Sequence, residues 1–267
     1  MGSAVLKPGV RYDMPPGFGA SVAPDLEQGF DLHGSAVEFE TTPEALEPLL
    51  PRWFRPTTRP VVSIGYRQMI GMAWMGGRNY QLLAVRCSAE CEIGGRWVPN
   101  SFGLVIWESD CAPILAGREL MGSPKLYADI PPITVSGADH SFTAMEYESL
   151  LVRGTVADLR PVPEAEVARK REMQKQSLVY YWKYVPGLDG EPDADYPVAI
   201  KLETPFTQMW TGRGSLELGA PTLQEAPYSS HIVKRLAQLP RRSDVSASVW
   251  LAADCKLYRD QTRRLDR

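Results

Sequence analysis

Lys125 is the residue of this sequence with the clearest potential for covalent chemistry. It ends the segment Gly117–Lys125, and Met121 and Leu126 make its surroundings in the sequence largely apolar. An amine becomes nucleophilic when burial or a nearby cation makes its charged form costly, and Arg118 is the nearest cation in the sequence. Because most lysines are solvated surface groups, the segment alone also permits an exposed, inert Lys125.

A neutral lysine amine can attack a ketone or 2-oxo carbonyl and expel water, which leaves an iminium. The iminium is an electron sink that stabilises the carbanion left by decarboxylation, by α-proton removal or by aldol cleavage. One lysine therefore supports several reactions, and the groups around it select among them. Since the lysine itself supplies the sink, we predict that no cofactor is needed.

Several separated segments of the chain resemble the acetoacetate decarboxylase family, whose lysine forms a Schiff base with a ketone. The matching segments occur in the family's order and span roughly residues 35–258. They are Ala112–Leu120 before the lysine, Pro124–Lys125, Met209–Gly212 leading to Leu216 and Leu218, Ser229–His231, and an apolar strand over Val249–Tyr258.

The resemblance also implies an arginine near the start of the first core strand and two acids that project towards the lysine. By order and spacing, the arginine position falls at about Leu32, next to His33, and the acids fall at about Gly65 and at Gln81. None of these residues carries the expected charge. We therefore predict a Schiff-base lyase that acts on a small oxo acid, with an aldehyde as partner in an aldol reaction. Aldol-type bond formation or cleavage, dehydration or both are favoured over acetoacetate decarboxylation, as activities among family relatives imply.

Four further residues are candidates for substrate binding or proton transfer. Gln81 offers a donor and an acceptor, while Tyr80 and Tyr258 offer hydroxyl groups. Arg67 follows Gly65 by two residues, which places both on one face of a strand and makes Arg67 a candidate carboxylate clamp. Three of them have a structural alternative: an amide bonded to its strand neighbours for Gln81, an exposed arginine for Arg67, and an aromatic residue at the end of a barrel for Tyr258.

Two other functions compete with the Schiff-base lyase. The first is a 3-oxo acid decarboxylase of the acetoacetate type. The second is a non-catalytic protein that binds a hydrophobic carbonyl compound. Borohydride trapping with oxo acids separates both enzymes from the binding protein, and carbon dioxide release separates the two enzymes.

Composition limits the class of protein and its partners. The chain has 267 residues, of which 44% are hydrophobic and 23% charged, as expected for one globular domain. Its net charge of -3 and pI of about 5.7 give no overall attraction to nucleic acid or to an anionic membrane. No apolar run approaches the roughly 18 residues of a spanning helix, and the amino terminus lacks the features of a secretory signal.

The cysteines and histidines predict neither disulfides nor a metal site. If Cys87 and Cys91 share a strand, they lie roughly 13 Å apart, which is too far for a disulfide. Reduced thiols in a cytoplasmic protein are the simplest account of the four cysteines. The three histidines are scattered, and the cysteine pair lacks the usual zinc spacing.

The order of elements predicts a single α+β domain over residues 32–260, built on a curved or closed antiparallel sheet with a few peripheral helices. The family resemblance implies that this sheet forms a cone-like β-barrel with the lysine inside. Residues 1–31, rich in Gly and Pro, predict an irregular arm that could wrap a neighbouring subunit of a homo-oligomer. Residues 261–267 belong to a basic, solvated tail.

The predicted elements are a short helix over 42–50, strands between 61 and 156, a helix over 164–178, a strand over 198–210, a helix over 231–239 and a strand over 245–257.

Overall fold

The computed structural model describes residues 5–10, 12–20, 28–136, 139–243 and 245–266. The rest of the predicted arm, the predicted strand break at Gly137 and the end of the tail at Arg267 lie outside the described residues. The described part of the arm is mostly exposed and contains the 3-10 turn Pro16–Phe18 (η1).

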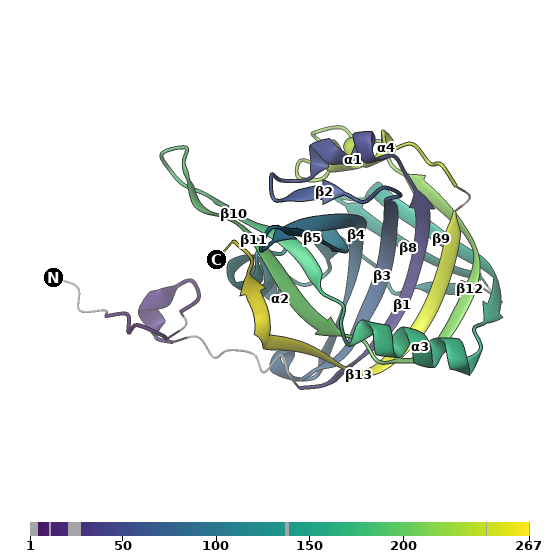
Figure 1. Cartoon of the computed structure of the whole chain (residues 1–267), viewed down its shortest axis with the longest axis horizontal. Helices are drawn as coiled ribbons and strands as arrows, with labels where there is room; N and C mark the ends of the chain where they lie inside the picture. Colours follow the sequence, from purple (N-terminus) through teal and green to yellow (C-terminus); the bar gives the residue numbers. More distant parts are fainter. Residues whose placement is uncertain (1–4, 11, 21–27, 137–138, 244, 267) are drawn as a thin grey trace.

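Seven strands form a closed ring at the centre of the molecule (Figure 1). Each pairs with the next in the order β1-β3-β4-β5-β10-β11-β13, and β13 pairs back with β1. This ring surrounds an interior that is lined by side chains of its strands. The ring strands are β1 (Phe30–Glu40), β3 (Val61–Met72), β4 (Arg78–Ile93), β5 (Arg96–Glu108), β10 (Val179–Pro186), β11 (Pro192–Glu203) and β13 (Ser246–Arg264).

A second layer of strands continues from β13 and covers part of the ring from outside. The ring of Phe142 stacks on that of Tyr66 at a centroid distance of 6.1 Å, which joins the outer layer to β3. The prediction of a mostly antiparallel α+β domain is therefore confirmed. The strands of this layer are β12 (Phe206–Leu218), β9 (Ser149–Pro161), β8 (Asp139–Glu146) and β7 (Thr134–Ser136). A short strand, β2 (Phe54–Pro56), pairs with β4.

Side-chain alternation divides each ring strand between two cores. Tyr66 on β3 and Leu83 on β4 point outwards into the core beneath the second layer. Their sequence neighbours Arg67 and Leu82 point into the ring, because successive residues of a strand face opposite sides. The ring strands therefore bury side chains on both of their faces.

The helices are short and peripheral. Helix α1 (Pro43–Leu46) begins after Thr42, whose Oγ1 accepts a hydrogen bond from the Ala45 amide, and the 3-10 turn Glu47–Leu49 (η2) follows it. This confirms the short helix predicted there. Helix α4 (Ser230–Ala237) also lies close to its predicted position and buries an apolar face against the outer core.

Helix α3 (Glu164–Gln174) ends four residues before the predicted limit at residue 178. The reason is the buried Lys201 on β11, whose Nζ donates to the carbonyl oxygens of Gln174, Lys175 and Ser177. These carbonyls have no helical partners at the end of a helix, and the lysine satisfies them.

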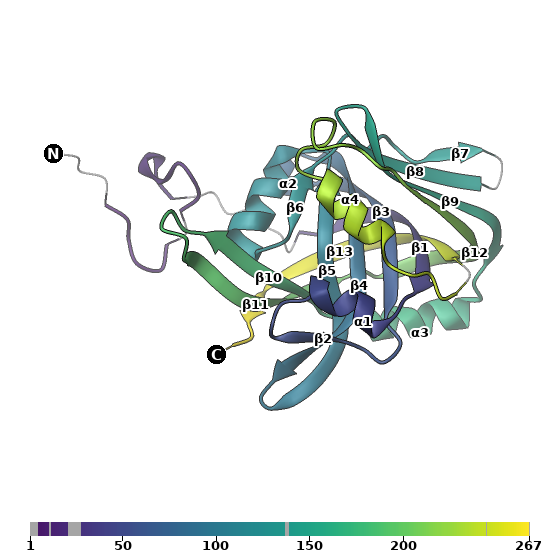
Figure 2. The ribbon, with the colours of Figure 1, turned by 90° about the horizontal axis from the view of Figure 1, so that it is seen from above.

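Three other segments differ from the predicted elements. The predicted strand 198–210 is interrupted between Glu203 and Phe206, where Pro205 lacks an amide donor, and belongs to both β11 and β12. Strands β10 and β11 form a hairpin that extends away from the ring (Figures 1 and 2). Strand β13 continues to Arg264, which pairs with Val198, so part of the predicted tail belongs to the ring.

Candidate active site

A helix that the sequence did not predict positions Lys125. Helix α2 (Cys111–Ala116) begins after Asp110, whose carboxylate accepts a hydrogen bond from the Ala112 amide at 2.8 Å. A π-helical turn, Gly117–Met121 (η4), continues it and ends at Gly122, which has a left-handed φ of 66°. The chain then enters the short strand β6 (Lys125–Tyr127), which pairs in parallel with β5.

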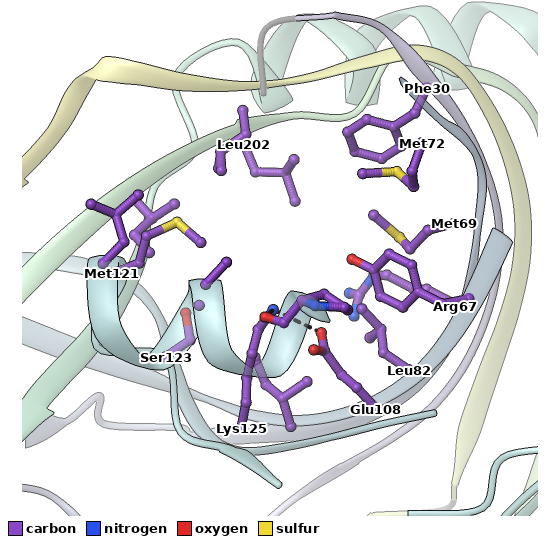
Figure 3. Close-up of a pocket in the computed structure, with 18 of the residues that line it drawn as sticks. Phe30, Arg67, Met69, Met72, Leu82, Glu108, Met121, Ser123, Lys125 and Leu202 are labelled. Carbon is purple, nitrogen blue, oxygen red and sulfur yellow. Dashed lines mark hydrogen bonds and ion pairs between the residues drawn. The ribbon is translucent and has the colours of Figure 1, made fainter. Parts of the chain in front are cut away.

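The side chain of Lys125 points into a cavity inside the ring rather than into bulk water (Figure 3). The residue is only 8% exposed. Its Nζ donates to the Pro113 carbonyl oxygen at 2.9 Å and lies 2.9 Å from Oε1 of Glu108. The backbone of Lys125 is held from outside the cavity, since the exposed Arg118 donates to its carbonyl oxygen at 2.8 Å.

Glu108, at the end of β5, is the acid of this site, and the sequence reasoning missed it. Its side chain is fully buried, and no hydrogen-bond partner for Oε2 occurs among the described residues. Burial raises the pKa of Glu108, and the opposing effect of Lys125 is smaller. Glu108 therefore holds a proton more tightly than a solvated glutamate does, and it lies where it can exchange one with Lys125.

Two arginines also line the cavity, Arg67 from β3 and Arg86 from β4. Burial, and to a smaller extent the charge of Arg86, lowers the pKa of Arg67 to about 9, so its guanidinium stays protonated at neutral pH. Within the described part of the chain, Arg67 Nη1 and Arg86 Nε are buried without a hydrogen-bond partner. Guanidinium groups with unused donors are suited to bind a carboxylate.

Tyr80 lies in the same cavity and is 6% exposed. Its pKa is raised well above the usual value, first by burial and then by the negative charges of Glu108 and Asp110. Its hydroxyl group is therefore protonated at neutral pH. The cavity has a volume of about 120 Å³, and much of its remaining lining is apolar. The apolar lining includes Phe30, Met69, Met72, Leu82, Ile106, Met121, Leu202 and Leu257.

The structure therefore brings together three of the predicted site residues, Lys125, Tyr80 and Arg67, and places the other two elsewhere. The side-chain Oε1 of Gln81 accepts a hydrogen bond from Ser109 Oγ at 3.1 Å. Gln81 lies between Tyr80 and Leu82 on β4, so its side chain faces away from the cavity.

Tyr258 and the position expected for an arginine also lie apart from the cavity lining. The hydroxyl group of Tyr258 donates to Glu203 Oε2 at 2.8 Å, and Tyr258 is not among the described residues that line the cavity. At the position expected for an arginine, Leu32 is buried in the core and His33 is exposed.

Neither a metal cluster nor a membrane-spanning helix is found in the part of the chain that the structure describes. No group of three or more His, Cys, Asp or Glu residues is arranged to hold a metal ion there. None of the described helices is long and apolar enough to cross a membrane.

Comparison with known proteins identifies the family. The family model of acetoacetate decarboxylase (ADC) matches residues 13–254. The chain belongs to the acetoacetate decarboxylase family. The resemblance predicted from the segments around Lys125 is thereby confirmed.

Relatives within the acetoacetate decarboxylase family are distant in sequence. The acetoacetate decarboxylase of Burkholderia multivorans is 26% identical over 225 residues, which cover 83% of this chain and 81% of that protein. Acetoacetate decarboxylase 1 of Bradyrhizobium diazoefficiens is 25% identical over 221 residues, which cover 82% of this chain and 79% of that protein.

Solved structures share the fold over nearly the whole chain. A structure described as acetoacetate decarboxylase is similar with a TM-score of 0.71 and 17% identity, covering 95% of this chain and 94% of that one. The enduracididine biosynthesis enzyme MppR, complexed with the condensation product of pyruvate and imidazole 4-carboxaldehyde, has a TM-score of 0.66 and 18% identity. That match covers 97% of this chain and 98% of MppR.

Proposed function

We propose that this protein is a cofactor-independent lyase that forms a Schiff base between Lys125 and a small oxo acid. We further propose that it favours aldol-type carbon–carbon bond formation or cleavage, dehydration or both, over acetoacetate decarboxylation. The observation that supports this most directly is the buried contact between Lys125 and Glu108 in a cavity that also contains Arg67. The closed ring of strands supports the expected cone-like β-barrel, which would keep the amine away from water.

Glu108 lets Lys125 become a nucleophile. The carboxylate takes one proton from the ammonium group at a distance of 2.9 Å, which leaves a neutral amine and a neutral carboxyl. The amine nitrogen attacks the substrate carbonyl carbon, and a carbinolamine forms. Glu108 then returns a proton to the carbinolamine oxygen, which leaves as water, and the iminium remains.

The iminium acidifies the carbon next to it. Once ionised again, Glu108 removes a proton from that carbon, and the electron pair moves into the carbon–nitrogen system to give an enamine. The enamine carbon attacks the carbonyl carbon of an aldehyde, and the new alkoxide takes a proton from Tyr80. Tyr80, now a phenolate, removes the remaining proton from the carbon next to the iminium while Glu108 protonates the hydroxyl group, which leaves as water. Hydrolysis of the iminium then releases the dehydrated product and restores Lys125.

Arg67 is the reason for placing aldol chemistry first. A guanidinium that binds the substrate carboxylate stabilises its charge, and this stabilisation is lost when the carboxylate leaves as carbon dioxide. The site therefore favours reactions that retain the carboxylate. The sequence alone favoured aldol chemistry because no acid was found at Gln81. Since Glu108 supplies an acid from another strand, the preference for aldol chemistry now depends on Arg67 instead.

Acetoacetate-type decarboxylation is the second candidate function. The curated relatives with 25–26% identity carry that name, and they match over most of the chain. Glu108 also favours it to a degree, because a carboxylate beside the iminium would destabilise a substrate carboxylate held close to it.

Borohydride trapping tests the proposed function. Pyruvate, acetoacetate, and pyruvate with imidazole 4-carboxaldehyde would each be incubated with the protein and reduced, and the labelled peptide mapped by mass spectrometry. We expect the label on Lys125, no label in Lys125→Met, and normal labelling in the control Lys175→Met, because Lys175 is an exposed lysine paired with Glu172. If carbon dioxide release from acetoacetate is faster than aldol turnover, decarboxylation becomes the first candidate function and aldol chemistry the second. No adduct with any carbonyl compound would favour the non-catalytic binding protein.

Two expectations about the setting of the enzyme belong to the same proposal. All four cysteines are unpaired, which supports a reducing, cytoplasmic location. The β10–β11 hairpin exposes Trp182 and Tyr184, which supports a homo-oligomer because aromatic side chains are enriched at interfaces. Light scattering of the purified protein tests the oligomeric state.

A further inference from the structure

The charged side chains that line the Lys125 cavity are unbalanced. Among the described lining residues, the cations are Lys125, Arg67 and Arg86, and the acid is Glu108. With Lys125 protonated, three positive charges and one negative charge leave a formal charge of +2. The iminium keeps the positive charge of the lysine, so one substrate carboxylate lowers the sum to +1 and two carboxylates bring it to zero. Since uncompensated buried charge is costly, the site is matched to a doubly negative ligand.

The two arginines lie on either side of a pair of small residues in the wall of the ring, close enough for the charge of Arg86 to act on Arg67. Gly65 on β3 pairs with Ala84 on β4, and both face the ring interior. Arg67 lies two residues beyond Gly65, and Arg86 lies two residues beyond Ala84, so the antiparallel pairing places the arginines on either side of this small pair. Arg67 Nη1 lies 3.9 Å from the position that a Cβ on Gly65 would take. The guanidinium of Arg67 therefore uses space that a larger residue at position 65 would fill.

Both guanidinium groups keep donors for a ligand. Arg67 Nη1 and Arg86 Nε are each buried without a partner in the described part of the chain. Glu38 lies in an adjoining hollow that Arg67 also lines, and its charge favours the protonated form of Arg67 without a hydrogen bond to Nη1. Glu108 is already paired with Lys125. A planar guanidinium binds a carboxylate through two parallel hydrogen bonds, so two guanidinium groups can hold two carboxylates.

The register of the strands distinguishes the roles of the two arginines. Arg67, Leu82 and Glu108 lie opposite one another on β3, β4 and β5, which places Arg67 in the row of the acid that contacts Lys125. Arg86 pairs with Gly103 and lies on the far side of the row that contains Ala84. Arg67 is therefore the arginine for the carboxylate next to the reacting carbonyl, and Arg86 is the one for a more distant group.

We infer that the natural substrate is a 2-oxo dicarboxylate, with one carboxylate bound by Arg67 and the second by Arg86. This inference rests on the proposed Schiff-base function and specifies its substrate class. The cavity has a volume of about 120 Å³, which corresponds to roughly four water molecules at about 30 Å³ each. This volume restricts the inference to a short dicarboxylate of about five carbon atoms.

Borohydride trapping with two probes of equal chain length tests the inference. 2-Oxoglutarate carries the second carboxylate, and 2-oxopentanoate carries a methyl group in its place. We expect 2-oxoglutarate to reach half-maximal labelling of Lys125 at a concentration at least about tenfold lower than 2-oxopentanoate does. The reason is that a charge-assisted hydrogen-bonded pair strengthens binding by at least about tenfold. Arg86→Met should remove this difference by weakening labelling with 2-oxoglutarate more than labelling with 2-oxopentanoate, while Arg86→Lys should retain part of the preference. Arg55→Met, at an exposed arginine paired with Glu90, is the control and should keep the full preference.

Calorimetry with glutarate and pentanoate, which cannot form a Schiff base, separates this inference from the proposed function. Tighter binding of glutarate that is lost in Arg86→Met supports the inference even if no adduct forms. Equal labelling or binding by the mono- and dicarboxylates overturns it and leaves the Schiff-base mechanism intact. Equal weakening of both ligands by Arg86→Met also overturns it, because both arginines would then hold a single carboxylate. Circular dichroism of each variant ensures that folded protein is compared.

Discussion

Gly117 lies directly against the side chain of Lys125. A Cβ placed on Gly117 would fall 2.5 Å from Cδ, 2.6 Å from Cε and 2.8 Å from Nζ of the lysine. The φ of Gly117 is -68°, an ordinary helical value, so the backbone does not require glycine there. The reason for this glycine is the space that it leaves for Lys125.

Replacement of Gly117 by alanine should therefore displace the amine without unfolding the protein. We expect Gly117→Ala to lower the rate of Schiff-base formation about ten- to a hundredfold, because a misplacement of about 1 Å is costly in catalysis. The end of the lysine is flexible, so the thermal midpoint should change little. Leu115→Ala, at an exposed position of the same helix, is the control. Wild-type trapping rates in Gly117→Ala would show that the contact has no role in positioning the amine.

The raised pKa of Glu108 predicts how stability depends on pH when Lys125 is removed. In Lys125→Met, the folded state binds the Glu108 proton more tightly than the unfolded chain, whose pKa is near 4.5. The stabilisation is complete below that value and is lost as pH rises through the higher folded pKa, by about 1.4 kcal/mol per pH unit between the two. Urea unfolding between pH 4 and 8 measures this loss. The double variant with Glu108→Gln should lack it, and parallel curves for the two proteins would contradict the expectation.

Arg67 should affect substrate binding more than stability. Arg67→Met removes a charge-assisted contact worth about 1.5–3 kcal/mol, so KM for an oxo acid should rise roughly ten- to a hundredfold. Steady-state kinetics with pyruvate and an aldehyde measures this change. The matched control is Arg153→Met, because Arg153 is exposed and paired with Glu217. An unchanged KM in Arg67→Met would remove Arg67 from the binding site.

Gln81 should have no direct influence on the reaction. Its side chain is bonded to Ser109 outside the cavity, so Gln81→Glu should not add decarboxylation of acetoacetate, although the family resemblance places an acid at this position. Tyr258→Phe should likewise leave trapping at Lys125 within about twofold of wild type, since Tyr258 is bonded to Glu203. Measured carbon dioxide release tests the first variant. A gain of release would mean that residue 81 reaches the iminium.

The four thiols should react at very different rates. Cys111 is exposed, whereas burial raises the pKa of Cys87 and Cys255 to about 12 and that of Cys91 to about 11. Because the thiolate is the reactive form, iodoacetamide at pH 8 should label Cys111 rapidly and the other three only in denaturant. Cys111→Ser should abolish the rapid phase, as quantified by mass spectrometry. Rapid labelling of Cys87 in the native protein would indicate that the outer core opens.

The features that the sequence determined are those with local causes. The cap at Thr42 and the proline after it specify a short helix, and β-branched and aromatic residues between Gly and Pro specify strands. The segment before Lys125, together with the family resemblance, indicated the candidate nucleophile, and two of its residues contact the lysine side chain: Pro113 accepts a hydrogen bond from Nζ, and Gly117 lies against Cδ, Cε and Nζ.

The rest of the site was decided by strand pairing, which depends on residues far apart in the chain. Glu108 contacts Lys125 because β6 pairs in parallel with β5, and no local sequence pattern predicts that pairing. Arg86 reaches the cavity, and Gln81 does not, because their positions on β4 differ in parity; a shift of one residue turns a strand side chain to the opposite face. The sequence alone thus determined the candidate nucleophile, and tertiary structure decided which charges surround Lys125, because register and ring closure are set by the packing of the whole sheet.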